Sequence, residues 1–195
     1  MVSDIAMPLH AYLAGPDVFL PNAAENGAAK IAICAKYGIT GHIPFNPDIA
    51  HILTLPHDEA WRRLYLADIE MMEQCDFVIA NLTPFRGASA DSGTLVEIGW
   101  FLGRGRLVFG YSNAVESFAE RSIAQAAAVP DPIPGLAVEG FSLPDNLMVP
   151  GAVEYGGGLP ITLPQDGVSR RFDALDVFEA CVAAVAARMP HKPAC

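Results

Sequence analysis

Three acidic residues carry the chemistry that this sequence could perform. Asp91 lies in a polar loop at 83–94, Glu97 lies just inside the helix expected after it, and Asp68 falls on the apolar stripe of an earlier helix. A carboxylate on the core-facing side of a helix is costly unless it is paired or used. Grouped carboxylates with almost no basic residues nearby suit glycosidic chemistry, in which one carboxylate attacks or stabilises the anomeric carbon and another handles the proton of the leaving group.

Each of these acids also has an ordinary structural interpretation. Thr94 and Glu97 have the spacing of a capping box, in which the glutamate reaches back to the backbone amide of the N-cap residue. Asp91 fits a turn residue, and Asp68 could lie at the edge of its stripe, where it would reach water or cap a neighbouring loop. From spacing alone, capping is favoured over catalysis for Glu97, because helix caps are common.

The catalytic interpretation makes two electrostatic predictions. The N-terminus of the helix would keep Glu97 ionised, as a nucleophile requires. Desolvation would raise the pKa of Asp68, which suits a proton donor.

Motifs for other chemistries are missing. The sequence contains no GxGxxG, Walker A, GxSxG or HExxH pattern. None of the five histidines has metal-ligand spacing: His10, His42, His51, His57 and His191. We therefore expect neither a metal nor another cofactor.

The strand–loop–helix–strand pattern of residues 76–111 must position the acids of the loop and of the following helix. Residues 77–79 and 107–109 are short continuous apolar runs, typical of strands buried on both faces of a parallel sheet. In open α/β sheets, ligands bind outside the carboxyl ends of the strands. The 83–94 loop leaves such an end, so its acids are expected to face a ligand.

The N-terminal part of the chain shows the same alternation of elements. Strands are expected at 10–15 and near 39–43. Between them a helix is expected to carry Pro21 in its first turn, where the missing N–H costs nothing, and to run to Tyr37 before the C′ glycine Gly38.

Further helices are expected along the rest of the chain. One spans 58–74 with Asp58 as its N-cap, and its core-facing stripe comprises Trp61, Leu64, Tyr65, Ile69 and Met72. Others are expected within 112–128 and at 172–189. Residues 129–170 are rich in Pro and Gly and too long for a simple connection, so they are expected to form a functional or subunit-contacting excursion. Four or five strands alternating with helices give a three-layer α/β fold.

Composition limits the class of protein and of partner. The 195 residues are expected to form a single domain, 1–195, and 52% of them are hydrophobic. A formal net charge of −10 without a Lys/Arg cluster argues against nucleic acid as a partner. No stretch is apolar enough for a membrane helix and no signal peptide opens the chain. The four scattered cysteines suit reduced thiols, so we expect a cytoplasmic protein.

Several blocks of residues across most of the chain form a recognisable pattern. They are YLAGPDVF at 12–19, ADI at 67–69, CDFVIANL at 75–82, PFRG at 84–87, DSGT at 91–94, EIG at 97–99 and DNLM at 145–148. With these blocks the sequence resembles the nucleoside 2-deoxyribosyltransferases. The Asp-x-Gly-Thr-x-x-Glu spacing is the most specific of them.

The resemblance implies a flavodoxin-like fold with a mostly parallel sheet of about five strands, and a retaining double displacement on 2′-deoxynucleosides. Glu97 would attack the anomeric carbon and hold a covalent deoxyribosyl intermediate, and Tyr12 would orient it by a hydrogen bond. Asp91 would grip the 5′-hydroxyl of the sugar, and Asp68 would manage the proton of the base. Deoxynucleosides and free nucleobases are the implied partners, and hydrolysis is the side reaction.

The resemblance also implies a homo-oligomer, a dimer or a hexamer. Asn146 would reach a neighbouring site to bind sugar hydroxyls, and Met148 would pack close to the nucleophile. Candidates for the base pocket are Phe19 and the turn that holds Asn46 and Asp48, and Gly15 is a further candidate for substrate binding. Two alternatives stay open: a nucleoside or nucleoside 5′-monophosphate N-glycosidase on the same fold, and a nucleotide-binding module without catalysis.

Overall fold

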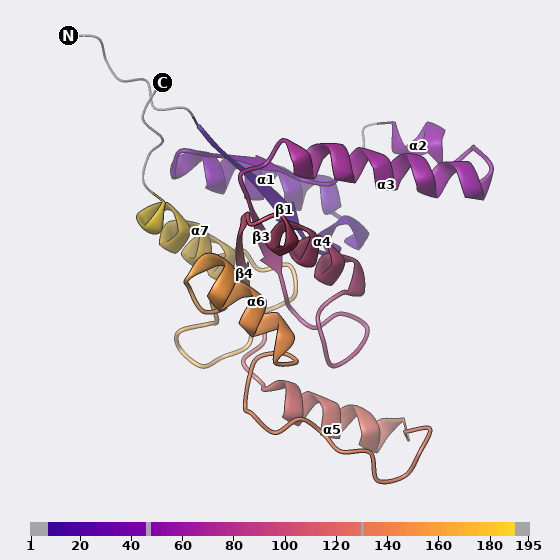
Figure 1. Ribbon diagram of the computed structural model, residues 1–195, viewed down its shortest axis with the longest axis vertical. Coiled ribbons are helices and arrows are strands. Elements are labelled where there is room, and N and C mark those ends of the chain that lie inside the picture. Colours follow the sequence, from indigo (N-terminus) through magenta and orange to yellow (C-terminus); the bar gives the residue numbers. More distant parts are fainter. Residues whose placement is uncertain (1–7, 46–47, 130, 190–195) are drawn as a thin grey trace.

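A parallel sheet forms the centre of the protein. The computed structural model describes residues 8–45, 48–129 and 131–189. Four strands lie in the order β2-β1-β3-β4 (Figure 1). They are β1 (Leu9–Ala14), β2 (Ile39–His42), β3 (Phe77–Asn81) and β4 (Leu107–Tyr111). This is the flavodoxin-like order without its last strand, so the predicted α/β fold class is confirmed.

The prediction of about five strands is one too high for the described part of the chain. A single parallel bridge between Tyr111 and Thr162 lies where a fifth strand would pair with β4. Thr162 accepts a hydrogen bond from the Ser112 amide and donates its own N–H back to β4, both at 2.9 Å. Pro160 and Pro164 flank it, and because proline lacks a backbone N–H, the ladder does not extend.

Helices cover both faces of the sheet. The described helices are η1 (Pro16–Phe19), α1 (Ala23–Lys36), α2 (Ile49–Ile52), α3 (His57–Glu73), α4 (Ser92–Gly103), α5 (Phe118–Ala128), α6 (Met148–Gly157) and α7 (Asp176–Arg188). One core lies between the sheet and the pair α1 and α7, and the other lies between the sheet and the set α3, α4 and α6. The three predicted layers are therefore present.

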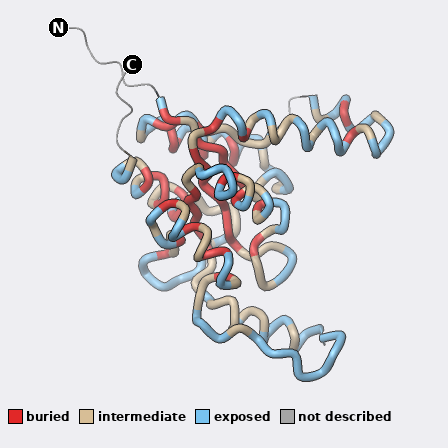
Figure 2. The backbone as a smooth tube through the Cα atoms, in the orientation of Figure 1, coloured by how far each residue is buried: buried red, intermediate tan, exposed pale blue. Residues whose placement is uncertain are grey.

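Alternate residues of each strand enter the two cores, as the period of two requires. In β3, Phe77 and Ile79 belong to the core with α1 and α7, whereas Val78 and Ala80 belong to the opposite core. All of β3 is buried, and Figure 2 shows the buried positions concentrated in the sheet. This placement explains why its sequence is a continuous apolar run.

Two predicted helix starts are wrong. Pro21 precedes α1, whose N-cap is Asn22, because the chain first forms the 3-10 helix η1. Pro56, with an extended ψ of 139°, is the N-cap of α3. Asp58 therefore lies in the first turn, where its Oδ2 is 3.1 Å from Nη1 of Arg62. The C′ role of Gly38 is confirmed by its φ of +73°.

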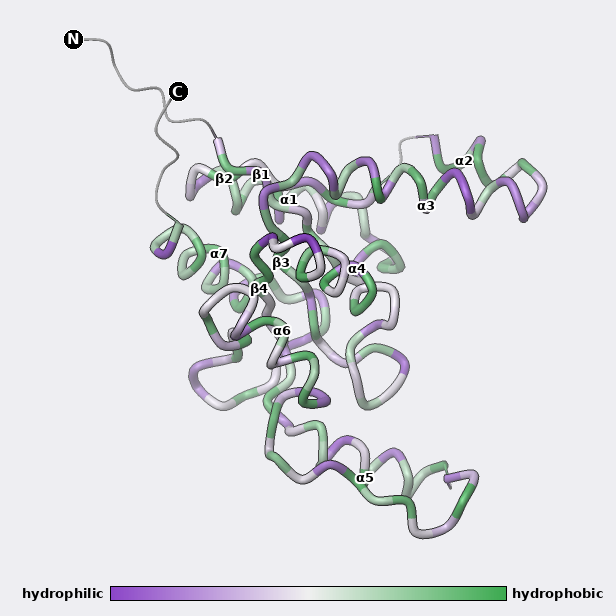
Figure 3. The backbone as a smooth tube through the Cα atoms, in the orientation of Figure 1, coloured by the Kyte–Doolittle hydropathy of each residue, from purple (hydrophilic) through white to green (hydrophobic). Residues whose placement is uncertain are grey.

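The apolar stripe expected on α3 meets the core only at its C-terminal end. Met72 is buried, but Trp61 is 56% exposed and Tyr65 is 54% exposed. A helix of 17 residues is about 25 Å long, and its first half projects beyond the sheet together with α2 (Figures 1 and 3). The stripe is therefore core-facing for only part of its length, contrary to the prediction.

The Pro/Gly-rich excursion contains a helix that was not predicted, α6. Its buried residues include Pro150 and Val153, which pack against β4 and α4. Pro150 lies in the first turn, where a missing N–H is tolerated. The helices expected within 112–128 and 172–189 are present as α5 and α7. Among the described helices, none is long and apolar enough to cross a membrane.

Candidate active site

The candidate site begins with a contact between β1 and α4. The Tyr12 hydroxyl donates a hydrogen bond to Oε1 of Glu97 at 2.7 Å. Tyr12 is fully buried, and its ring lies 5.9 Å from the ring of Phe101, one turn beyond Glu97 on α4. The core therefore fixes the phenol, and the phenol fixes one oxygen of the Glu97 carboxyl.

Glu97 is not the helix cap that its spacing favoured. The N-cap of α4 is Asp91, whose Oδ2 accepts hydrogen bonds from the Thr94 amide at 3.1 Å and the Thr94 hydroxyl at 3.3 Å. Asp91 has an extended backbone, with φ −60° and ψ 134°, whereas Thr94 already lies inside the helix. The capping box prediction for Thr94 and Glu97 is wrong, and Asp91 is a helix N-cap rather than the turn residue considered from the sequence.

Asp68, on α3, lies within electrostatic reach of Tyr12 and Glu97. Its charge raises the pKa values of both Tyr12 and Glu97. Burial raises the pKa of Asp68 itself to about 6. The raised pKa expected for a proton donor is therefore present, and α3 and α4 bring their acids within electrostatic reach of each other.

Glu97 has a raised pKa, contrary to the prediction that the helix N-terminus would hold it ionised. Burial raises this pKa to about 7; the hydrogen bond from Tyr12 lowers it, and the charges of Asp68 and Asp91 raise it. Glu97 is the sixth residue of α4, and the effect of a helix terminus falls off within the first turn. Burial also raises the pKa of Tyr12, which remains a hydrogen-bond donor.

This arrangement suits a reaction that needs one carboxylate and one carboxylic acid. The carboxyls of Glu97 and Asp68 have pKa values of about 7 and about 6, so between these two pH values they hold roughly one proton between them, mostly on Glu97. Searching the described residues for three or more grouped His, Cys, Asp or Glu side chains finds no set able to hold a metal ion.

Gly15 and Phe19 lie beyond the end of β1, as expected. Gly15 has a φ of +153°, and a Cβ there would lie 2.8 Å from the Cβ of Asn81, so a side chain does not fit. Phe19 is 62% exposed and stacks on Phe85 with ring centroids 5.8 Å apart. The Arg86 guanidinium lies over both rings. An exposed aromatic ring, supported by Phe85 and Arg86, therefore lies beyond the end of β1.

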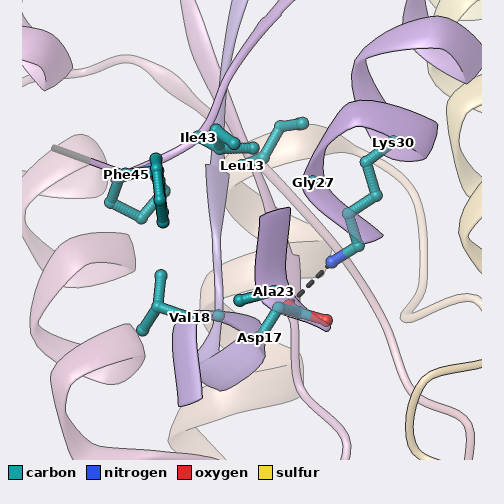
Figure 4. Close-up of a pocket in the computed structure, with 10 residues that line it drawn as sticks. Leu13, Asp17, Val18, Ala23, Gly27, Lys30, Ile43 and Phe45 are labelled. Carbon is teal, nitrogen blue, oxygen red and sulfur yellow. Dashed lines mark ion pairs between the residues drawn. The ribbon is translucent and has the colours of Figure 1, made fainter. Parts of the chain in front are cut away.

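Among the described residues, the cavity found beside the expected base pocket is small. A cavity of about 20 Å³ lies between η1, α1 and the chain after β2, lined in part by Leu13, Val18 and Phe45 (Figure 4). This volume suits one water molecule. Asp48 is exposed at the start of α2, and Asn46 lies outside the described residues.

A buried ion pair beside this cavity was missed by the sequence analysis. Lys30 is 3% exposed, and its Nζ lies 2.7 Å from Oδ2 of Asp17. Asn81 donates hydrogen bonds to both oxygens of Asp17, at 3.1 and 3.2 Å. Figure 4 shows the ion pair. Lys30 shares the buried face of α1 with Gly27 and Cys34. A lysine three and four residues from apolar positions of the same helix was the signal in the sequence that could have predicted its burial.

Asn146 and Met148 lie at the start of α6, away from Glu97 of the same chain. Met148 is 71% exposed. Both residues line a groove of about 380 Å³ with Leu95 and Ile98 of α4. Those two side chains share a helix face that Glu97 does not. A single chain therefore unites Tyr12, Asp68, Asp91 and Glu97, whereas Asn146 and Met148 line a groove on another face of α4.

Asp145 is a second residue whose part the sequence analysis missed. It stands in the 145–148 block, to which no role was assigned for this position, and it is 1% exposed. Its carboxylate binds the loop before Asp91. An acid directly after a proline inside a Pro/Gly-rich stretch offered no local signal of burial.

Solved structures of other proteins share this fold. A 2-desoxiribosyltransferase from Leishmania mexicana superposes with a TM-score of 0.62 and 25% identity, covering 92% of this chain and 98% of that one. A conserved protein from Enterococcus faecalis gives a TM-score of 0.53 at 18% identity, covering 94% of this chain and 100% of that one. The second likeness concerns the fold alone.

The sequence comparisons agree with the geometry. A curated relative, an uncharacterised protein of Schizosaccharomyces pombe, is 28% identical in an alignment 195 residues long that covers 91% of this chain and 89% of that protein. The family model described as nucleoside 2-deoxyribosyltransferase matches residues 11–148, a span that includes all four residues gathered around Glu97. The chain belongs to the nucleoside 2-deoxyribosyltransferase family.

Proposed function

We propose that this protein transfers the 2-deoxyribosyl group between the nucleobases of 2′-deoxynucleosides, by a retaining double displacement through a covalent intermediate on Glu97. The observation that supports this proposal most directly is the 2.7 Å hydrogen bond from Tyr12 to Glu97, close to the charges of Asp68 and Asp91. Family membership and the Leishmania mexicana structure support the reaction class.

In the first step, a carboxylate oxygen of Glu97 bonds to C1′ of the sugar as the bond from C1′ to the base nitrogen breaks. The bonding pair leaves with the nitrogen, and the base takes a proton from Asp68. Tyr12 orients Glu97 and favours its ionised form, consistent with the lowering effect of this hydrogen bond on the Glu97 pKa. The raised pKa of Asp68, about 6, lets this carboxyl hold the proton for the departing base in those molecules in which Glu97, with a pKa of about 7, is ionised.

In the second step, a nitrogen of another nucleobase attacks C1′ and gives up its proton to Asp68. The bond between C1′ and Glu97 breaks and returns the carboxylate. Two inversions give net retention at C1′. Water that attacks instead of a base gives hydrolysis as the side reaction.

Asp91 selects the unphosphorylated sugar by accepting a hydrogen bond from the 5′-hydroxyl. As the helix cap it uses Oδ2, and within the described residues Oδ1 has no hydrogen bond and is free to accept one. A carboxylate at this position would repel a phosphate dianion. The proposal therefore favours nucleosides over nucleoside 5′-monophosphates as substrates.

The remaining sugar contacts come from a neighbouring subunit of a homo-oligomer, a dimer or a hexamer. Asn146 would reach into the neighbouring site and Met148 would pack against the nucleophile there. Two observations support this: both residues lie on another side of α4 from Glu97, and Met148 is 71% exposed in the single chain. Phe19 would offer its exposed ring to the base, together with Gly15 and the segment that holds Asn46 and Asp48.

The non-enzymatic alternative has lost its main support. A binding module was plausible as long as Glu97 could be a helix cap, but Asp91 occupies that position. A carboxyl with its pKa raised to about 7 by burial is more typical of catalysis than of capping.

The test is base exchange. Incubation with 2′-deoxyinosine and adenine should yield 2′-deoxyadenosine, and Glu97→Ala should abolish the reaction while the fold is retained. Mass spectrometry after mixing with a deoxynucleoside should detect a deoxyribosyl adduct on Glu97. Base release without exchange would identify a hydrolase, turnover of the 5′-monophosphate alone would identify the phosphate-specific relative, and no turnover at all would contradict the proposal.

A further inference from the structure

Asp145 lies outside the group around Glu97, yet it binds two segments that carry sugar-binding candidates. Oδ1 of Asp145 accepts hydrogen bonds from the Ser89 hydroxyl at 2.5 Å and from the backbone N–H of Asn146 at 2.7 Å. Its Oδ2 accepts one from the backbone N–H of Ala90 at 2.8 Å. The side chain is 1% exposed. One buried carboxylate thus receives donors from the loop after β3 and from the start of α6.

Arg121 of α5 holds the same two segments from the other side. Its Nε donates to the carbonyl of Ala88 at 2.8 Å, and its Nη2 donates to the carbonyl of Pro144 at 2.6 Å. Its Nη1 donates to the carbonyl of Glu116. Burial lowers the pKa of Arg121, and the attraction between its charge and that of Asp145 offsets part of this effect. The buried carboxylate is therefore matched in charge as well as in hydrogen bonds.

The position of this anchor matters more than its stability. Ala90 directly precedes Asp91, and Asp145 directly precedes Asn146. A backbone amide held by a charged acceptor is fixed more tightly than one held by a neutral group. A misplacement of about 1 Å in a group that binds substrate can cost roughly a hundredfold in rate.

We propose that Asp145 is the positioning residue that aligns two sugar-recognition groups, Asp91 in its own site and Asn146 in the neighbouring site. The inference rests on the proposed function and extends it. Because Asp145 binds the backbone beside both groups, the position of the 5′-hydroxyl acceptor in one site is linked to the backbone position of Asn146, whose side-chain amide donates to Glu139 at 2.6 Å.

The experiment compares two sugar donors in the full-length protein, with adenine as the acceptor. 2′-Deoxyinosine has the 5′-hydroxyl that Asp91 is proposed to bind, and 2′,5′-dideoxyinosine lacks it. The wild type should prefer the first donor in kcat/KM by roughly ten- to a hundredfold, as expected for a hydrogen bond to a charged group. In Asp145→Asn this preference should fall to within about threefold, because Asp91 is no longer aligned.

The ratio of the two donors separates positioning from general damage. A purely structural role would lower kcat/KM for both donors equally and leave the ratio unchanged, which would overturn the inference. Ser89→Ala removes only one donor to Asp145 and should lower the ratio less. It also carries the test if Asp145→Asn fails to fold. Glu154→Gln, an exposed change on α6, should leave the ratio as in the wild type.

Failure of this inference can be told from failure of the proposed function. If the wild type exchanges no base with either donor, both fall. If the wild type exchanges bases and prefers the 5′-hydroxyl, but neither Asp145→Asn nor Ser89→Ala lowers that preference, only the role of Asp145 falls.

Discussion

Two polar clusters lie near the carboxyl end of β1, and they differ in whether their charges are balanced by opposite charges. The paired cluster comprises Asp17, Lys30 and Asn81, and the acidic cluster comprises Tyr12, Asp68, Asp91 and Glu97. In the paired cluster the buried ammonium meets a carboxylate at 2.7 Å. In the acidic cluster three carboxyls approach one another with a phenol as the hydrogen-bond donor to Glu97.

The difference separates a cluster built for stability from one built for reaction. Lys30 also lies over the rings of Tyr111 and Phe178, at 5.5 and 5.2 Å, so its charge is matched on several sides. Asp68 and Glu97 are left with raised pKa values, which means that burial works against their ionised forms. A fold tolerates such a penalty where a chemical step needs it.

The largest expected effect is in the acidic cluster, on activity. Glu97→Gln should lower base exchange by roughly 10³-fold or more, because the nucleophile is removed. Stability should not fall with it. The folded state binds the Glu97 proton more tightly than the unfolded state, so the penalty is present above pH 7, where the folded carboxyl is ionised, and disappears below the ordinary pKa of 4.5.

Urea unfolding at pH 8 and at pH 5 tests the stability part of this prediction. Glu97→Gln should be more stable than the wild type at pH 8, by on the order of 1–2 kcal/mol, and should gain less at pH 5. Lower stability than the wild type at pH 8 would mean that Glu97 is a structural residue and would remove the contrast between the clusters.

The opposite outcome is expected in the paired cluster. Lys30→Met should lower the free energy of unfolding by about 3–5 kcal/mol, because Asp17 is left buried without its partner. The double variant Lys30→Met with Asp17→Asn should recover part of the lost stability. The denaturant midpoint of the single and of the double variant measures these two effects. If the folded fraction of Lys30→Met lost activity as severely as Glu97→Gln, the paired cluster would have to be assigned to the reaction.

A smaller effect is expected from Tyr12→Phe. Without the phenol hydrogen bond the pKa of Glu97 should rise further, since that bond lowers it. Exchange at pH 7 should fall roughly tenfold, and the acidic limb of the pH profile should move to higher pH. Tyr65→Phe, on an exposed ring of α3, is the matched control. An acidic limb that stays in place would show that Tyr12 does not set the ionisation of Glu97.

The smallest effect concerns the wild type alone. The profile of kcat/KM against pH should be bell-shaped, with apparent pKa values near 6 and near 7 that belong to the Asp68 and Glu97 pair. Below this range Glu97 is protonated and cannot attack, and above it Asp68 has lost the proton for the base. Asp68→Asn should flatten the alkaline limb. A profile that is level from pH 5 to pH 8 would contradict the coupling.

Much of the fold could be predicted from local pattern. The apolar runs of β3 and β4 and the glycine after α1 were interpreted correctly because burial and turn geometry leave direct marks on sequence. The failures arose where a pattern had two solutions. The spacing of Thr94 and Glu97 matches a capping box, but the N-cap of α4 is Asp91, about one turn earlier. The residue before that N-cap, Ala90, is held by Asp145, which lies far away in the sequence.

Other errors came from lengths and distances that no local window contains. The stripe of α3 is apolar throughout, but the sheet is too short to cover Trp61 and Tyr65. The burial of Lys30 depends on Asp17, which reaches it from the segment after β1. A helix beginning at Met148 was hidden because Pro150 and the glycines around it are typical of loops.

The sequence by itself determined which residues could react and in which layer of the fold they would lie. Composition, apolar runs and the spacing of Asp91 and Glu97 act over one or two turns of chain. Only the tertiary structure decided that Tyr12, 85 positions away, donates its hydroxyl to Glu97. It also decided that Glu97 has a raised pKa, because desolvation and the repulsion of like charges depend on what other elements place around a side chain.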